Sequence, residues 1–314
     1  MKKYIFGIDI GGTTIKCGLF SSEGEIIDKW EIPTNIENEG KYLLPDVANT
    51  ILSKCEERKI SREEVEGVGV GVPGPVKNDG IVVVGVNINW TKEKPVKEEL
   101  EALIKIPVSV GNDANVAALG ELWLGAAKGS KDAIMFTLGT GVGGGVIVNG
   151  KVIAGTHGAG GEIGHSVSVL DGGTPCNCGK KGCLETVASA TGIVRETLKY
   201  LNSSEEGSSL RDLEKLEAKD VFDEAKKGDV VALKMVDQLG FYLGIACANL
   251  TVAVDPEKII IGGGVSKAGN ILINAIKKNY QNYAFSAVSE TEFAIAELGN
   301  DAGIIGAAYL AKKG

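Results

Sequence analysis

The sequence has no surplus of basic residues, since 33 Lys and Arg stand against 41 Asp and Glu, a formal net charge of −8. Proteins that bind nucleic acid or anionic membranes need extra cations to neutralise phosphates, so we expect neither partner. The chain also has no run of the roughly 18 apolar residues that cross a bilayer. No signal-type apolar stretch with a cleavage site follows the opening MKKYIFGIDI. These absences predict a cytoplasmic protein.

Cysteine and histidine are scarce, with six and two residues. In a reducing compartment six cysteines are not expected to form a disulfide framework, so a spacing suited to metal binding is the alternative. Four donors within one short stretch form the set of a Cys₃His zinc site: His165, Cys176, Cys178 and Cys183. Four protein ligands leave no open position, which predicts structural zinc. The alternative is free thiols beside a loop histidine. His157 lacks such company and is interpreted as an ordinary loop residue.

The length of 314 residues suits two α/β domains with a cleft between them. The 44 glycines gather in discrete clusters, which are candidate ligand loops rather than a low-complexity linker. We expect a small α/β domain over 1–115 and a large one over 116–300 that contains the zinc loop 157–185. A terminal helix over 301–314 is expected to pack back on the small domain.

Two glycine-rich hairpins repeat one layout along the chain. Strands at 4–10 and 15–20 flank the turn Gly11-Gly12-Thr13-Thr14, and strands at 133–138 and 145–149 flank the segment 139–144. The repetition suggests two similar halves. Further strands are expected at 65–72, 107–111 and the KIIIG segment 258–262, and helices at 114–127 and 229–252.

Two familiar nucleotide motifs do not account for the glycine-rich segments of this chain. The segments 69–74 and 139–144 both fit G-x-G-x-x-G, so a dinucleotide enzyme is an alternative. The first match runs into Pro-Gly-Pro and the second into another strand, whereas a Rossmann turn must open a helix. The Walker pattern is also absent around Gly179-Lys180.

The remaining pattern is Asp-x-Gly-Gly-Thr-x-x-Lys in one hairpin, Gly-Thr-Gly in a second and a glycine run after KIII. This pattern resembles the actin, Hsp70 and hexokinase superfamily, which implies a two-domain actin-like ATPase (ribonuclease H-like) α/β fold with a nucleotide and sugar cleft. The resemblance implies that Asp9 holds Mg²⁺, directly or through water; alternatively Asp9 satisfies a turn amide. It also implies that ATP is bound by Gly11, Gly12, Thr13, Thr14, Lys16, Thr140, Gly141, Gly263 and Gly264.

A second resemblance is more specific. The segment Gly161-Glu162-Ile163-Gly164-His165, followed by Cys176-x-Cys178-Gly179-x-x-Gly182-Cys183-x-Glu185, is similar to the signature of the ROK family of bacterial sugar kinases and repressors. The resemblance covers essentially the whole chain. It implies ATP-dependent phosphorylation of a hexose at its 6-hydroxyl, with glucose as the first expectation, and a homodimer.

Sugar phosphorylation needs a carboxylate that orients the acceptor hydroxyl and takes its proton. Asp113, in the motif Gly-Asn-Asp-Ala-Asn, is the expected general base; alternatively it is only a helix N-cap. The resemblance assigns the sugar to Gly74, Asn87, Asn112, Asp113, Glu162, His165 and Glu185. Solvated loop carboxylates remain the alternative for the two glutamates. We further hypothesise that zinc positions His165 for the sugar.

The sequence leaves several alternative functions open. A repressor of this family carries an N-terminal helix-turn-helix, whereas the first strand here begins by Tyr4, so we expect no DNA module. A non-catalytic sugar sensor would differ in making no ADP. Fructose, mannose, N-acetylmannosamine and N-acetylglucosamine remain alternative acceptors, and polyphosphate an alternative donor. The kinase hypothesis expects the turns near residues 11 and 140 to face one another with Asp113 at the acceptor end.

Overall fold

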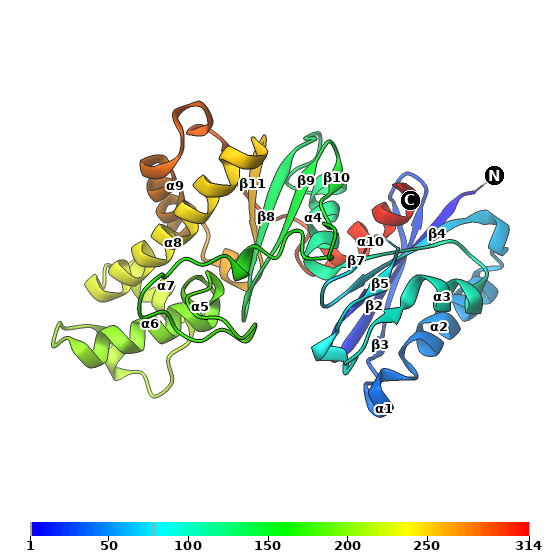
Figure 1. Cartoon of the computed structure of the whole chain (residues 1–314), viewed down its shortest axis with the longest axis horizontal. Helices are drawn as coiled ribbons and strands as arrows, with labels where there is room; N and C mark the ends of the chain where they lie inside the picture. The colour runs from blue at the N-terminus through cyan, green and yellow to red at the C-terminus, as the bar shows by residue number, and fades with distance from the viewer. Residues whose placement is uncertain (1, 78, 314) are drawn as a thin grey trace. The chain divides into compact units, whose positions relative to one another are not determined.

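The computed structural model describes residues 2–77 and 79–313. By their contacts these residues form two compact units (Figure 1). The chain passes between them four times. The first unit comprises Met1–Gly129, Gly145–Gly161 and Leu298–Gly314, and the second comprises Ser130–Gly144 and Glu162–Glu297. The domain limits expected from the sequence stay a prediction.

The first unit contains a sheet with the strand order β3-β2-β1-β4-β7. The three strands β1, β2 and β3 pair antiparallel, and β4 and β7 extend the sheet parallel to β1. The strands are β1 (Tyr4–Ile10), β2 (Thr14–Ser21), β3 (Ile26–Pro33), β4 (Val65–Val72) and β7 (Val108–Asn112). The first hairpin and the strand over 65–72 thus lie where the sequence predicts them.

Alternate residues of β1 face two different layers, as the two-residue period of a strand requires. Phe6, Ile8 and Ile10 join the core beneath α2 (Leu43–Arg58) and α3 (Val96–Ile104). Ile5 packs on the opposite face, against α10 (Ala302–Lys313). The terminal helix therefore packs on the first sheet (Figure 1).

Glycines on the α10 face of the sheet let this helix approach the strands without intervening side chains. A Cβ atom at Gly7 would lie 1.9 Å from the carbonyl oxygen of Ile304, and one at Gly69 would lie 1.7 Å from that of Ala307. Gly69 belongs to the glycine cluster over 67–74, one of those that the sequence predicts as candidate ligand loops. In the structure it is a packing residue inside β4.

Helix α4 (Asp113–Leu124) packs against α10 in the same manner. A Cβ atom at Gly306 would lie 1.7 Å from the carbonyl oxygen of Val116, and one at Gly120 would lie 2.4 Å from that of Ala302. No side chain larger than hydrogen fits at either position. The two helices are thereby fixed in one register along their contact.

The second unit contains the parallel strands β8 (Ala133–Leu138), β11 (Lys258–Gly262) and β12 (Glu292–Ile295), with β11 in the middle. Strand β9 (Val142–Val148) leaves this unit and enters the first, where it pairs with β10 (Lys151–Val152). Four longer helices complete the second unit: α6 (Ala190–Ser203), α7 (Ala218–Lys227), α8 (Val230–Val254) and α9 (Asn270–Tyr283).

Helix α8 is long and apolar enough to cross a membrane by length and composition alone. More than half of its most apolar window is buried inside the fold, however, and it packs on α6, α7 and α9. Gly240 and Gly244 bring its backbone against Ala275 and Tyr280 of α9. These contacts are those of a core helix.

Shorter elements connect these strands and helices. They are α1 (Glu37–Gly40), η1 (Arg62–Glu64), β5 (Ile81–Val82), η2 (Val86–Ile88), β6 (Lys94–Pro95), η3 (Ile163–His165), α5 (Glu185–Ala188), η4 (Ser209–Asp212), η5 (Gly264–Ala268), η6 (Ser286–Val288) and η7 (Gly299–Asp301).

The contact between β4 and α10 yields a stability prediction. Gly69→Ala places a methyl group where the Ala307 carbonyl now lies, so we expect a loss of about 2 kcal/mol or more in the free energy of unfolding. Gly207→Ala, at an exposed position with nothing within 4 Å of the added carbon, should change it by less than about 0.5 kcal/mol. Urea unfolding checks both variants. Equal midpoints for both would show that α10 does not pack on β4 in this way.

Candidate functional site

A carboxylate and a lysine lie on paired strands at the end of the first hairpin. Asp9 of β1 is directly opposite Lys16 of β2, and the turn between them is closed by the Gly11 N–H, which donates to the Thr14 carbonyl at 3.0 Å. Gly12 lies against the exposed Asn87, since a Cβ atom at Gly12 would be 3.1 Å from the Asn87 carbonyl oxygen. The first unit thus gathers several of the predicted residues at one end of its sheet.

Asn112 ends β7 and caps the helix that follows. Its Oδ1 accepts hydrogen bonds from the N–H groups of Ala114 and Asn115, and its Nδ2 donates to the Gly74 carbonyl at 3.1 Å. The capping role that the sequence left open for Asp113 therefore belongs to Asn112. Asp113 is the first residue of α4, and its Oδ1 accepts from the Ala114 N–H at 2.7 Å.

Asp9 and Asp113 lie close enough to affect one another electrostatically. Burial raises the pKa of Asp113. Burial, and secondarily the negative charge of Asp113, raise the pKa of Asp9 to about 6, while Lys16 opposes the shift. Two partly buried carboxylates kept near each other are costly for folding and are typical of sites that bind a cation or move a proton.

The turn of the second hairpin is held against the N-terminus of α6. The Gly139 carbonyl accepts a hydrogen bond from the Ala190 N–H at 2.8 Å, and the Thr140 carbonyl accepts one from the Thr191 hydroxyl at 2.8 Å. A helix N-terminus carries partial positive charge and favours anions. This turn and helix therefore suit a phosphate group.

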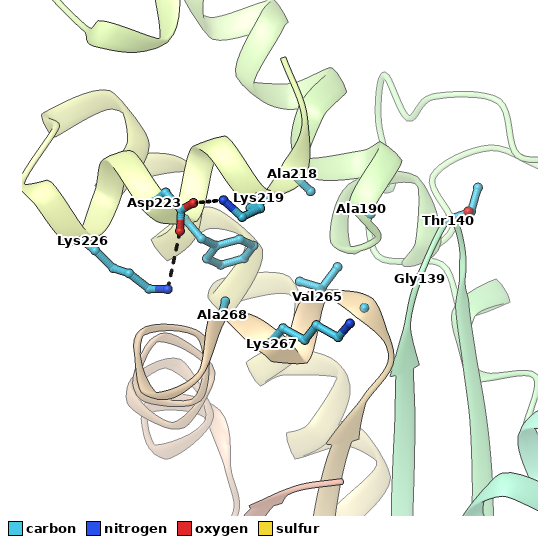
Figure 2. A pocket seen from close by; sticks show the side chains of 12 residues that line it. Gly139, Thr140, Ala190, Ala218, Lys219, Asp223, Lys226, Val265, Lys267 and Ala268 are labelled. Carbon is cyan, nitrogen blue, oxygen red and sulfur yellow. Dashed lines mark hydrogen bonds and ion pairs between the residues drawn. The ribbon is translucent and has the colours of Figure 1, made fainter. Parts of the chain in front are cut away.

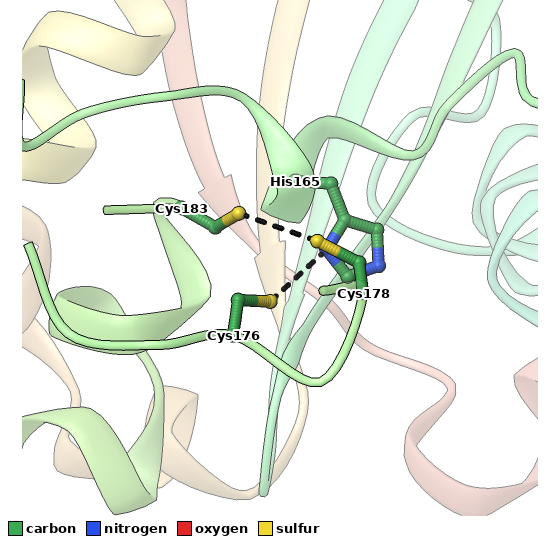
Figure 3. A group of neighbouring side chains, drawn as sticks. All are labelled: His165, Cys176, Cys178 and Cys183. Atoms are coloured by element: carbon green, nitrogen blue, oxygen red, sulfur yellow. Dashed lines mark hydrogen bonds between the residues drawn. The ribbon is translucent and has the colours of Figure 1, made fainter. Parts of the chain in front are cut away.

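The four predicted zinc ligands converge in the second unit (Figure 3). Their donor atoms all lie within 4.8 Å of one another. The sulfur of Cys176 is 3.6 Å from His165 Nδ1, and the sulfurs of Cys178 and Cys183 are 3.6 Å apart. In a zinc tetrahedron with bonds of about 2.3 Å, neighbouring sulfurs are separated by about 3.8 Å. The donor set and its spacing therefore fit a tetrahedral zinc ion.

The thiols of this cluster have unequal acidities. The pKa of Cys178 is lowered, first by the backbone N–H of Lys180, whereas burial raises the pKa of Cys183 and raises that of Cys176 to about 12. A zinc ion binds thiolates and would displace the protons from all three.

Two glutamates contact residues of the cluster. His165 turns its other ring nitrogen, Nε2, toward Glu162 at 3.9 Å. Glu185 accepts a hydrogen bond from the Cys176 thiol at 3.2 Å and another from the Val142 N–H at 3.3 Å. A Cβ atom at Gly141 would lie 2.2 Å from Glu185 Oε2, which explains the glycine there. Glu185 thus connects the cysteine loop to the second hairpin turn.

A cavity of about 400 Å³ opens beside that turn, wholly within the second unit (Figure 2). Its wall is mostly apolar and combines Gly139 and Thr140 with α7 and η5. At its rim Asp223 pairs with Lys219 at 2.5 Å and with Lys226 at 3.7 Å. The lining residues are Gly139, Thr140, Ala190, Ala218, Lys219, Phe222, Asp223, Lys226, Gly264, Val265, Lys267 and Ala268.

Most of this wall was not predicted from the sequence. Of the predicted nucleotide residues, Thr140 and Gly264 line the cavity. Gly263 instead lies against β8, because a Cβ atom there would be 2.5 Å from the Leu138 carbonyl oxygen. The α7 residues that line the cavity belong to no recognisable sequence motif. Their pattern is that of an ordinary amphipathic helix, and they come to lie beside η5 only in the folded chain.

The predicted residues thus form two groups. Asp9, Gly11, Gly12, Thr13, Thr14, Lys16, Gly74, Asn87, Asn112 and Asp113 belong to the first unit. Thr140, Gly141, Glu162, His165, Cys176, Cys178, Cys183, Glu185, Gly263 and Gly264 belong to the second. The roles expected for them stay predictions.

The chain is similar to known proteins over nearly its whole length. A glucokinase of Halalkalibacterium halodurans is 48% identical over 99% of this chain and 96% of its own length. The crystal structure of a ROK family glucokinase from Streptomyces griseus, in complex with glucose and AMPPNP, is 34% identical, with a TM-score of 0.77 over 99% of this chain and 100% of that chain.

Regulators share the same fold. A ROK family transcriptional regulator, a homologue of E. coli MLC protein, is 27% identical, with a TM-score of 0.85 over 99% of this chain and 78% of that chain. The expected mixed α/β fold of the actin-like ATPases is confirmed by these neighbours. The ROK family profile matches residues 5–314, and the chain belongs to the ROK family.

Proposed function

We propose that this chain transfers the terminal phosphate of ATP to the 6-hydroxyl of a hexose, with glucose as the preferred acceptor. The observation that carries this proposal is the near full-length similarity to a glucokinase, combined with an acidic residue, Asp113, at the head of α4 beside Asp9. Phosphoryl transfer requires positioning and charge stabilisation more than covalent chemistry, and the two groups of residues offer both.

On the acceptor side, Asp113 is the proposed general base. Its raised pKa makes the carboxylate a better proton acceptor than an exposed aspartate would be. Asn112 fixes the head of α4 through its capping bonds and holds Gly74 through its Nδ2. We propose that Gly74, Asn87 and Asn112 contact the sugar near Asp113.

On the donor side, we propose that the nucleoside occupies the cavity beside Thr140 and Gly264. Its apolar wall suits a purine, and the turn at the α6 N-terminus suits the phosphates. Gly11, Gly12, Thr13, Thr14, Lys16, Gly141 and Gly263 are proposed to complete the ATP site. Asp9 would hold Mg²⁺, which neutralises the charge of the phosphates when bound.

From the second unit, Glu162, His165 and Glu185 are proposed to bind sugar hydroxyls. Nδ1 of His165 faces the cysteines and Nε2 faces Glu162, so a metal on Nδ1 would orient the ring for the sugar. A Cys₃His site requires reduced thiols, which supports the proposed cytoplasmic location. The expected homodimer stays a prediction, which the mass of the native protein tests.

The role of Asp113 is tested by Asp113→Asn. The amide keeps the shape but cannot take a proton, so kcat for glucose should fall by about 10²- to 10⁴-fold, with a smaller change in KM. Asp212→Asn, at an exposed carboxylate of η4, should leave both constants unchanged. A coupled ADP assay measures them. Normal turnover by Asp113→Asn would refute its assignment as the base.

The metal proposal is tested by chelation. The purified chain should contain about one zinc per molecule, and its removal should raise KM for glucose by about tenfold or more, because His165 loses its orientation. Cys178→Ser should have the same effect, and Cys55→Ala, outside the cluster, should not. Metal analysis and sugar kinetics are the measurements. A zinc-free protein with unchanged KM would contradict the link between metal and sugar.

The carboxylate pair predicts a pH effect on stability. The folded-state pKa of Asp9 is about 6, above its ordinary 3.8, so the folded state binds the extra proton between these values and loses stability as pH rises through them. Asp9→Asn should therefore be the more stable protein at pH 8, by roughly 2–3 kcal/mol, with little difference near pH 4. Urea unfolding without Mg²⁺ or nucleotide tests this. A difference of equal size at both pH values would exclude titration of Asp9 as its cause.

Two alternatives remain testable. Fructose, mannose, N-acetylmannosamine and N-acetylglucosamine would compete as acceptors, and polyphosphate as donor; ratios of kcat/KM rank them. The similarity to a regulator favours a sugar-sensing role as the second candidate. A sensor would bind glucose without producing ADP.

A further inference from the structure

Helix α4 contacts the chain beside each of the four peptide bonds through which it passes between the units. These bonds follow Gly129, Gly144, Gly161 and Glu297. They are the peptide links between the two units, and all the contacts described below lie inside the first unit.

The first turns of α4 contact two of these passages. Asn115 is 3% exposed, and its Nδ2 donates to the Gly160 carbonyl at 2.9 Å, two residues before Glu162. Gly145, the first residue after the second passage, lies against the same part of the helix. A Cβ atom at Gly145 would be 2.5 Å from the Ala118 methyl group and 3.3 Å from the Asn115 Cα.

The end of α4 contacts the other two passages through one carboxylate. Glu121 is fully buried; its Oε2 accepts from the Ala126 N–H at 2.8 Å and its Oε1 accepts from the Leu298 N–H at 2.9 Å. Leu298 is the first residue after the fourth passage, and Ala126 lies in the turn before the first. Segments about 170 residues apart in the sequence are thus tied to one side chain.

The stability of the fold does not by itself explain why position 115 is an asparagine. Its Oδ1 is buried and has no hydrogen-bond partner among the residues that the structure describes. An unpaired buried acceptor opposes folding, and an apolar residue would avoid that cost. The bond to Gly160 is therefore retained at a site where packing would favour another side chain.

We propose that Asn115 and Glu121 are positioning residues for phosphoryl transfer. Through them α4 holds all four passages, so that Asp113 at its first position has a fixed place relative to the segments that lead into the second unit. This inference rests on the proposed function, in which Asp113 acts on a sugar. Neither residue contacts substrate in this proposal, and both act through the placement of Asp113.

The test uses the full chain with Asn115→Ala and Glu121→Gln. The first removes the bond to Gly160, and the second replaces one acceptor oxygen of the carboxylate by an N–H donor. Displacement of a catalytic group by about 1 Å costs up to about 100-fold in rate, so each variant should lower kcat for glucose by about tenfold to 100-fold. KM for MgATP should stay within about twofold of wild type, because neither variant changes a residue proposed to contact ATP and the cavity proposed for the nucleoside is lined by the second unit.

Thr197→Val is the matched control. Thr197 is fully buried in the second unit, and its hydroxyl donates to the Ile193 carbonyl within α6. This variant should lower the melting temperature without lowering kcat. Should Glu121→Gln not fold, Asn115→Ala decides alone.

The proposal is overturned if the folded α4 variants keep kcat within about twofold of wild type. It is equally overturned if they lose no more kcat than Thr197→Val at the same drop in melting temperature. A wild-type chain that phosphorylates no sugar would contradict the proposed function itself. Active wild type with unaffected variants would contradict the role of α4 alone.

Discussion

The close approach of α10 to both the first sheet and α4 is the contact on which the proposed acceptor side depends. Glycines remove the side chains at these contacts, so backbone packs directly on backbone. Gly303 lies beside Asp9, since a Cβ atom there would be 2.4 Å from the Asp9 carboxylate. Gly306 lies beside α4, whose first residue is Asp113. The last helix of the chain therefore brings together two carboxylates that belong to different elements.

The second unit relies on a different kind of connection. Glu185 bonds both to a cysteine of the Cys₃His cluster and to the hairpin turn at Val142, and the same turn borders the cavity proposed for the nucleoside. Through Glu185 the cysteine loop is therefore linked by hydrogen bonds to the turn of the second hairpin. Such outer contacts around a metal site commonly tune what the first ligands do.

Local patterns of the sequence revealed the parts of the fold that are local in origin. Alternating apolar residues and glycine turns predict the first hairpin and β4, which the structure contains. The spacing of one histidine and three cysteines predicts a cluster of metal-binding donors, and their donor atoms do converge. The sequence does not decide whether Asn112 or Asp113 caps α4, because Asn and Asp both suit the N-cap position of a helix. Only the hydrogen bonds show that Asn112 takes that role.

Contacts between segments that are distant in the sequence leave no pattern in the sequence that predicts them. Gly69 was interpreted as part of a ligand loop because glycine favours both turns and close packing, and α10 lies far away in the sequence. The cavity wall from α7 and the contacts of Glu121 with Leu298 are likewise set by tertiary packing. Periodicity within a segment cannot reveal which distant segment will lie against it.

Chemical identification of the product is the most direct test of the account. The purified chain is mixed with glucose and MgATP, and glucose 6-phosphate is quantified by an enzyme specific for it, alongside ADP. We expect the two products to appear in equal amounts. Glucose that binds but is recovered unphosphorylated, with no ADP formed above background, would contradict it.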